Sequence, residues 1–115
     1  MYIFLHNPRC SKSREALKLM DKSGKRYILR AYLKNALDLD ELRDLQEKLG
    51  IKAIDFTRTN EPEFGEQGLT KGSSDTEILK KMAHFPKLMQ RPIVYDEIRA
   101  VIGRPPEKIK EIFIR

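Results

Sequence analysis

The sequence predicts an α/β fold in which the elements follow in the order β-α-β, a helical middle, and β-β-α. Short apolar runs at residues 2–5, 27–29 and 93–95 have the length and composition of buried strands. Between residues 38 and 85, two segments carry apolar residues at helical spacing behind helix-capping signals. No linker, repeat or low-complexity tract divides the chain, so we expect residues 1–115 to form a single domain.

The first β-α-β unit places a cysteine at its first turn. The run YIFL (Tyr2–Leu5) is the expected first strand, and Pro8 interrupts it. A helix is expected from about Ser11, and it ends before Gly24. The second strand is YIL at residues 27–29. Cys10 therefore lies between the first strand and the first helix.

Two capping boxes mark the helices of the middle segment. Asp38 and Glu41 have the spacing of one box, and Ser74 and Glu77 have the spacing of the other. Behind each box, apolar side chains recur on one face, which is the pattern of a helix packed against a core. The residues expected to be buried there are Leu42, Leu45, Leu49, Ile78, Leu79 and Met82.

The last 25 residues predict two strands and a helix. We expect one strand at residues 93–95 and a second over 98–102, joined by a turn at Asp96-Glu97. Pro105 and Pro106 suit a helix start. The inner face of that helix is expected to carry Ile109, Ile112 and Phe113.

Composition and charge narrow the possible functions. The net charge is +6, but the basic residues are interleaved with 17 acidic ones, which favours a small anionic substrate over nucleic acid. No apolar run approaches the roughly 20 residues that cross a membrane. The single cysteine forms no internal disulfide, so a reducing cytoplasm is the expected location. The histidines and the cysteine have no metal-ligand spacing, so we expect no metal site.

Cys10 lies where a thiolate would be stabilised. The first turn of a helix presents unpaired backbone N–H groups and the positive end of the helix dipole. Arg9, Lys12 and Arg14 add positive charge nearby. Cysteines in such settings titrate at about 3.5–7.5 rather than about 8.5. A lone cysteine also fits a purely structural role as a small buried apolar residue, and these local features leave both readings open.

A resolving cysteine is absent from the Cys10 motif. Cys-x-x-Cys would supply a second thiol three residues later, but that position is Ser13. A covalent intermediate on Cys10 therefore needs a thiol from outside the chain.

Four stretches in order carry a family resemblance. They are HNPRCSKSRE, TRTNEPEF, QRPIVYD and IGRPPE, and together they span nearly the whole chain. In these stretches the sequence resembles the glutaredoxin-coupled arsenate reductase family, in particular its short branch related to Spx-type regulators. The resemblance implies a thioredoxin-like fold with a helical insertion and a mixed four-stranded sheet. It also implies an oxidoreductase that converts arsenate to arsenite, with no bound cofactor, glutathione as co-substrate and a glutaredoxin as partner.

The resemblance also assigns roles to residues of this chain. Cys10 is the expected catalytic thiolate that attacks arsenic, and planar guanidinium groups suit a tetrahedral oxyanion. A cis peptide bond is expected between Arg91 and Pro92, because thioredoxin-like folds place a cis-proline beside the active cysteine. The implied substrate-binding residues are Arg58, Arg91 and Arg104, and the implied supporting residues are His6, Ser13 and Pro92.

Two other functions fit the same resemblance. The arginines could bind glutathione carboxylates in a glutathione-dependent thiol reductase that acts on a different substrate. Alternatively, the chain could be an Spx-type regulator that binds RNA polymerase. Many such regulators use a Cys-x-x-Cys switch, which Ser13 removes here, and the three oxyanion arginines favour an enzyme.

Overall fold

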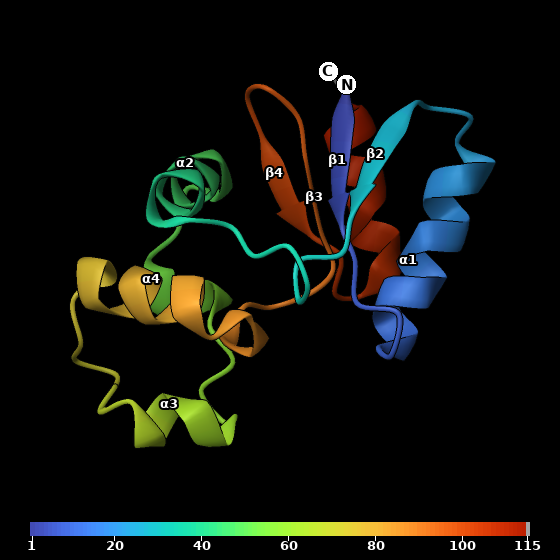
Figure 1. Ribbon diagram of the computed structural model, residues 1–115. Coiled ribbons are helices and arrows are strands. Elements are labelled where there is room, and N and C mark those ends of the chain that lie inside the picture. The colour runs from blue at the N-terminus through green and yellow to red at the C-terminus, as the bar shows by residue number, and fades with distance from the viewer. Residues whose placement is uncertain (115) are drawn as a thin grey trace. The chain divides into compact units, whose positions relative to one another are not determined.

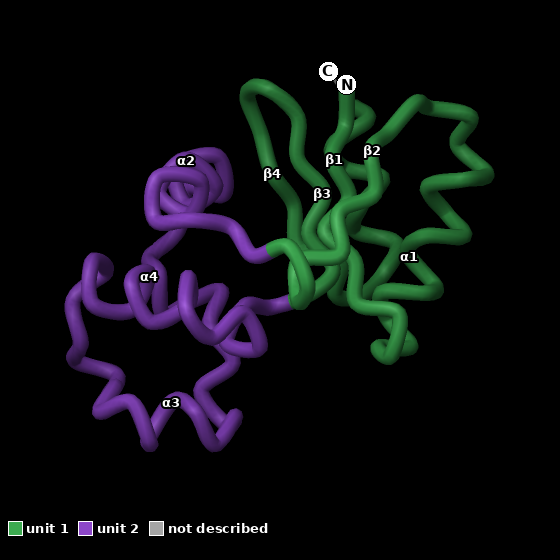
Figure 2. Tube along the Cα trace, viewed as in Figure 1, with its two compact units in different colours: residues 1–35, 91–115 green, residues 36–90 purple. Residues whose placement is uncertain are grey.

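The computed structural model describes residues 1–114, which form two compact units (Figures 1 and 2). Unit 1 combines residues 1–35 with the segment that begins at Arg91, and unit 2 comprises residues 36–90. The proposal of one domain over residues 1–115 remains a prediction, and its last residue lies outside the described residues.

Unit 1 is built on a mixed four-stranded sheet in the order β2-β1-β3-β4. The strands are β1 (Tyr2–Leu5), β2 (Tyr27–Arg30), β3 (Ile93–Tyr95) and β4 (Ala100–Ile102). β1 and β2 are parallel because a helix connects them, whereas β3 runs antiparallel to both β1 and β4. The predicted α/β fold with a mixed four-stranded sheet is therefore confirmed.

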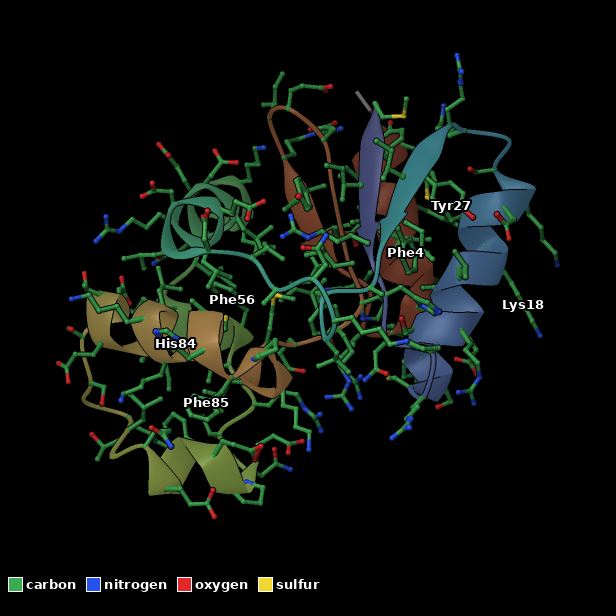
Figure 3. The ribbon with its side chains drawn as sticks, in the orientation of Figure 1. Phe4, Lys18, Tyr27, Phe56, His84 and Phe85 are labelled. Atoms are coloured by element: carbon green, nitrogen blue, oxygen red, sulfur yellow. The ribbon has the colours of Figure 1, made fainter. Side chains whose placement is uncertain are left out.

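Helix α1 (Ser11–Lys22) and the 3₁₀ helix η3 (Pro106–Phe113) pack side by side on the sheet (Figure 1). Their inner faces meet the side chains that β1 and β3 direct to that side, including Phe4, which also contacts the Tyr27 ring (Figure 3). The buried cluster consists of Tyr2, Phe4, Ala16, Met20, Val94, Ile109 and Ile112. This core fixes the start of α1, and thus Cys10, relative to the end of β1.

The β3–β4 turn differs from its predicted form. Ile98 was expected within a strand, but it lies in the turn with 74% of its surface exposed. The carboxylate of Asp96 accepts the backbone N–H groups of Ile98 and Arg99, both at 2.8 Å. Because these two N–H groups donate to Asp96, they are not available for hydrogen bonds between strands, and β4 begins only at Ala100.

Unit 2 is helical, as the sequence predicts. It contains α2 (Leu39–Leu49), η1 (Ala53–Phe56), α3 (Pro62–Glu66), α4 (Asp75–His84) and η2 (Pro86–Leu88). Both predicted capping boxes are present, at the starts of α2 and α4. Helices α2 and α4 pack against each other. Their buried side chains include Leu42, Leu45, Ile78, Leu79 and Met82, whereas Leu49 is only half-buried.

Gly103 lies where two structural elements of unit 1 meet. Its backbone N–H donates to the carbonyl of Pro92 at 2.8 Å. A Cβ atom at this position would lie 2.9 Å from a Pro92 side-chain carbon and 2.9 Å from Cγ2 of Ile109. Only glycine therefore allows the segment before Arg104 to approach Pro92 and η3 this closely.

We expect Gly103→Ala to destabilise the protein by about 1–3 kcal/mol, because the added methyl group overpacks this contact. Denaturant unfolding measures the change. Gly65→Ala is the matched control, since nothing lies within 4 Å of its Cβ and its φ is not positive. That variant should unfold at the wild-type denaturant concentration or slightly above it. Equal midpoints for Gly103→Ala and wild type would contradict the packing argument.

Candidate active site at Cys10

Cys10 is the N-cap residue of α1. Its backbone is extended, with φ −97° and ψ 121°. Its carbonyl accepts the N–H of Arg14 at 3.0 Å, and its own N–H donates to the carbonyl of Asn7 at 3.0 Å. The short loop after β1 thus turns the chain directly into the helix. As a result, the thiol stands at the helix N-terminus, with only 8% of the residue exposed.

The pKa of the Cys10 thiol is lowered from its usual value. Burial raises it, but the backbone N–H groups of Ser13 and Lys12 and the charge and hydrogen bond of Arg91 together outweigh burial. Hydrogen bonds and a positive charge favour the thiolate over the thiol. The first turn of α1 and Arg91, which is distant in the sequence, therefore stabilise the thiolate, which is the nucleophilic form of cysteine.

Two of the predicted substrate-binding arginines lie at Cys10. Arg104 directs Nη1 to within 3.8 Å of Cys10 Sγ, and the same nitrogen donates to the carbonyl of Arg91 at 3.1 Å. Arg91 buries Nε and Nη1, and neither nitrogen has a hydrogen-bond partner among the described residues. Buried donors without a partner are costly, so these two nitrogens would be stabilised by an acceptor. Two guanidinium groups thus lie beside the Cys10 sulfur, and one of them has donors without a partner.

His6 and Ser13 form a buried pair. His6 Nδ1 lies 2.7 Å from Ser13 Oγ, and Ser13 Oγ also accepts the N–H of Asn7 at 3.0 Å. Burial and then the charge of Arg14 lower the pKa of His6, which favours the neutral imidazole. The pair ties the end of β1 to the first turn of α1 and so holds the loop that carries Cys10.

The Arg91–Pro92 peptide bond is cis, as the sequence predicts, and the Arg104–Pro105 bond is cis as well. Each proline follows one of the two arginines at Cys10. Pro92 is buried at the start of β3, against the position of Gly103. Both arginines thus emerge from backbone segments that packing holds in place.

Arg58 belongs to unit 2. Its Nη1 lies 2.8 Å from Oε1 of Glu61, and both side chains are about one-fifth exposed. Its backbone N–H donates to the carbonyl of Leu88. The role of Arg58 in binding an oxyanion remains a prediction.

Three residues that shape these surroundings were not identified from the sequence. Asn7 accepts the N–H of Cys10 through its carbonyl and the N–H of Arg9 through its side chain. Gly103 provides the close approach described above, and Glu61 pairs with Arg58. The Asn7-Pro8 pair is a turn signal that could have indicated the first of these. The other two depend on contacts between distant parts of the chain or on side-chain orientation.

Within residues 1–114, no group of three His, Cys, Asp or Glu side chains is arranged to hold a metal ion. No described helix combines the length and the apolar character that spanning a membrane requires.

Replacing Arg91 by Gln should raise the pKa of Cys10, because the change removes both a positive charge and a hydrogen bond to the thiolate. The rate of iodoacetamide alkylation against pH measures this pKa, since only the thiolate reacts. The wild-type midpoint should lie below that of a free cysteine, and the variant midpoint should lie above the wild-type value. Arg26→Gln is the control, because Arg26 meets the start of β1, at the opposite end of that strand from Cys10. An unchanged midpoint in Arg91→Gln would rule out this source of activation.

Comparison with known proteins shows the family of the chain. The model of the ArsC family matches residues 5–112. The chain is 43% identical over 109 residues to a protein of Escherichia coli (strain K12) named uncharacterized protein YfgD, covering 93% of this chain and 92% of that one. It is 38% identical over 112 residues to an arsenate reductase of Haemophilus influenzae, covering 96% of this chain and 97% of that one.

A solved structure shares the fold over nearly its full length. The arsenate reductase from Vibrio cholerae superposes with a TM-score of 0.91 at 37% identity, covering 96% of each chain. Family model, relatives and solved structure thus agree along almost the entire sequence. The chain belongs to the ArsC family.

Proposed function

We propose that this protein is an arsenate reductase that depends on glutathione and glutaredoxin and uses Cys10 as its nucleophile. The observation that carries the proposal is the pair of buried, unpartnered nitrogens of Arg91 beside a thiol whose pKa is lowered. A tetrahedral oxyanion supplies acceptors for those nitrogens and an electrophilic centre for the thiolate. The arsenate reductases of Haemophilus influenzae and Vibrio cholerae, which are similar over nearly the whole chain, support this substrate.

The first step forms a bond between sulfur and arsenic. The Cys10 thiolate attacks arsenic(V), and one arsenate oxygen leaves as water after it is protonated. We propose that Arg91 and Arg104, which lie beside Cys10, hold the remaining oxygens, because a planar guanidinium group suits an oxyanion. Arg58 is proposed as a third anion ligand, as the resemblance implies.

The second step transfers two electrons to arsenic. A glutathione thiolate attacks Cys10 Sγ, and the electron pair of the sulfur–arsenic bond moves to arsenic, which becomes arsenite. The two sulfurs are left joined in a mixed disulfide, so the oxidation of two thiols balances the reduction of arsenic. A glutaredoxin thiolate then attacks the glutathione sulfur and releases the Cys10 thiolate.

The environment of Ser13 supports the need for an outside thiol. Ser13 occupies the position of a resolving cysteine, it is fully buried, and its hydroxyl contacts His6. Cys10 has no second thiol in this chain with which to form a disulfide. We therefore expect the purified protein to depend on a small thiol at each turnover.

Arsenite formation tests the proposed reaction. With arsenate, glutathione and glutaredoxin supplied, the wild-type protein should turn over, and Cys10→Ser should lose all turnover because it lacks the nucleophile. Without any thiol, the wild-type protein should form at most one adduct per chain. Sustained arsenite release without thiol would overturn the mechanism. A mixed disulfide on Cys10 without arsenite would instead favour the glutathione-dependent reduction of another substrate.

Oxyanion binding tests the arginines separately from the chemistry. In a Cys10→Ser background, calorimetric titration with arsenate should show weaker binding in Arg91→Gln and Arg104→Gln. A lost hydrogen bond to a charged group is worth about 1.5–3 kcal/mol, which corresponds to a fall of about 10- to 150-fold in affinity. Arg26→Gln controls for the loss of one positive charge, and Arg58→Gln tests the residue implied by resemblance. Wild-type affinity in both Arg91→Gln and Arg104→Gln would exclude an anion site at Cys10.

A further inference from the structure

A groove in unit 1 runs along α1 beside the start of η3. Its volume is about 460 Å³, which lies in the range of small-molecule sites. Leu19, Pro105 and Pro106 provide apolar lining, and three lysines of α1 provide positive charge: Lys12, Lys18 and Lys22. Figure 3 shows Lys18 extending from α1 away from the sheet.

One end of this α1–η3 groove lies at the candidate active site. On the α1 wall, Lys12 is the residue whose backbone N–H stabilises the Cys10 thiolate. On the η3 wall, Pro105 directly follows Arg104, whose Nη1 lies 3.8 Å from Cys10 Sγ. The end of the groove at Lys12 and Pro105 is therefore formed by direct neighbours of residues that contact the sulfur.

The charge of the groove favours carboxylates. Three lysines face two acidic residues, Glu15 and Glu107, so the lining carries a net positive charge. The ion pair between Lys12 Nζ and Glu15 is long at 3.7 Å, and about half of each side chain is exposed. Such a pair is worth little, so a carboxylate of a ligand can displace Glu15 from Lys12 at small cost.

The dimensions match a short peptide. From Lys12 to Lys22, α1 rises about 15 Å, whereas an extended tripeptide spans about 10 Å. An extended tripeptide therefore fits within the length of α1 that these lysines span.

We propose that the α1–η3 groove binds the small peptide thiol of the reaction by its carboxylates and directs its sulfur to Cys10. This inference rests on the proposed function, to which it adds a location for the co-substrate. Lys12 and Lys18 are the expected carboxylate ligands, and Glu15 opposes binding by competing for the same ammonium groups.

Thiol–disulfide exchange without arsenate tests the groove alone. The Cys10 thiolate attacks one sulfur of glutathione disulfide, a new S–S bond forms at Cys10, and a glutathione thiolate leaves with the electron pair and is protonated by water. The reference reaction is the same attack on 2-hydroxyethyl disulfide, which carries no charge. Because both reactions use the same thiolate, the ratio of the two rates removes any change in the pKa of Cys10.

We expect Lys12→Gln and Lys18→Gln each to lower this ratio about two- to fivefold, the range for one exposed ion pair. Glu15→Gln should raise the ratio, which is the opposite of a general effect of disturbing the helix. Added salt should reduce the wild-type ratio, because it screens exposed charges. Lys71→Gln is the matched control, since this exposed lysine does not line the groove.

Equal ratios in wild type, Lys18→Gln and Glu15→Gln would overturn the proposed groove, whatever the outcome of the arsenite assay. Conversely, the expected ratios in a protein that forms no arsenite would support the groove and reject arsenate as the substrate. The two proposals therefore fail independently.

Discussion

The contact between the Cys10 sulfur and the free N–H groups of the first turn of α1 is the constraint on which the rest of unit 1 depends. Burying a thiolate is unfavourable unless donors surround it, and here the backbone of Lys12 and Ser13 supplies donors that need no side chain. That arrangement requires β1 to end, the chain to turn, and α1 to begin within a few residues. The core cluster and the His6–Ser13 pair hold the loop between β1 and α1 in place.

The arginines complete the site from the opposite end of the sequence. Arg91 precedes β3 and Arg104 follows β4. The β3–β4 hairpin therefore brings both arginines to the end of the sheet at which β1 ends and the loop to Cys10 begins. Arg104 donates to the Arg91 carbonyl, which links the two segments directly. The negative charge of the Cys10 thiolate offsets the cost of keeping two cations beside each other.

Much of this arrangement could be predicted from the sequence because local signals agree with the fold. Apolar strands, the two capping boxes and the proline before η3 specify elements that tertiary packing does not override. The turn lies at Asp96-Glu97 as predicted, but the following strand starts at Ala100 rather than at Ile98, because bonds from the backbone to the Asp96 side chain compete with the strand ladder. Gly103 could not be recognised, since its importance lies in contacts with Pro92 and Ile109. Arg91 and Arg104 were singled out by resemblance alone, because hydrophobic periodicity does not show which arginines lie beside Cys10.

The buried position of Ser13 restricts how this scaffold could acquire an internal redox pair. A cysteine there would put a larger atom into a space where Oγ lies 2.7 Å from His6 and 3.0 Å from the Asn7 nitrogen. The weaker hydrogen bonds of sulfur would also loosen the tie between β1 and α1. A second thiol at this position would therefore need a compensating change at His6, because the contact with Asn7 is made by its backbone and stays whatever side chain stands there. The packing around Ser13 therefore disfavours a second thiol three residues after Cys10.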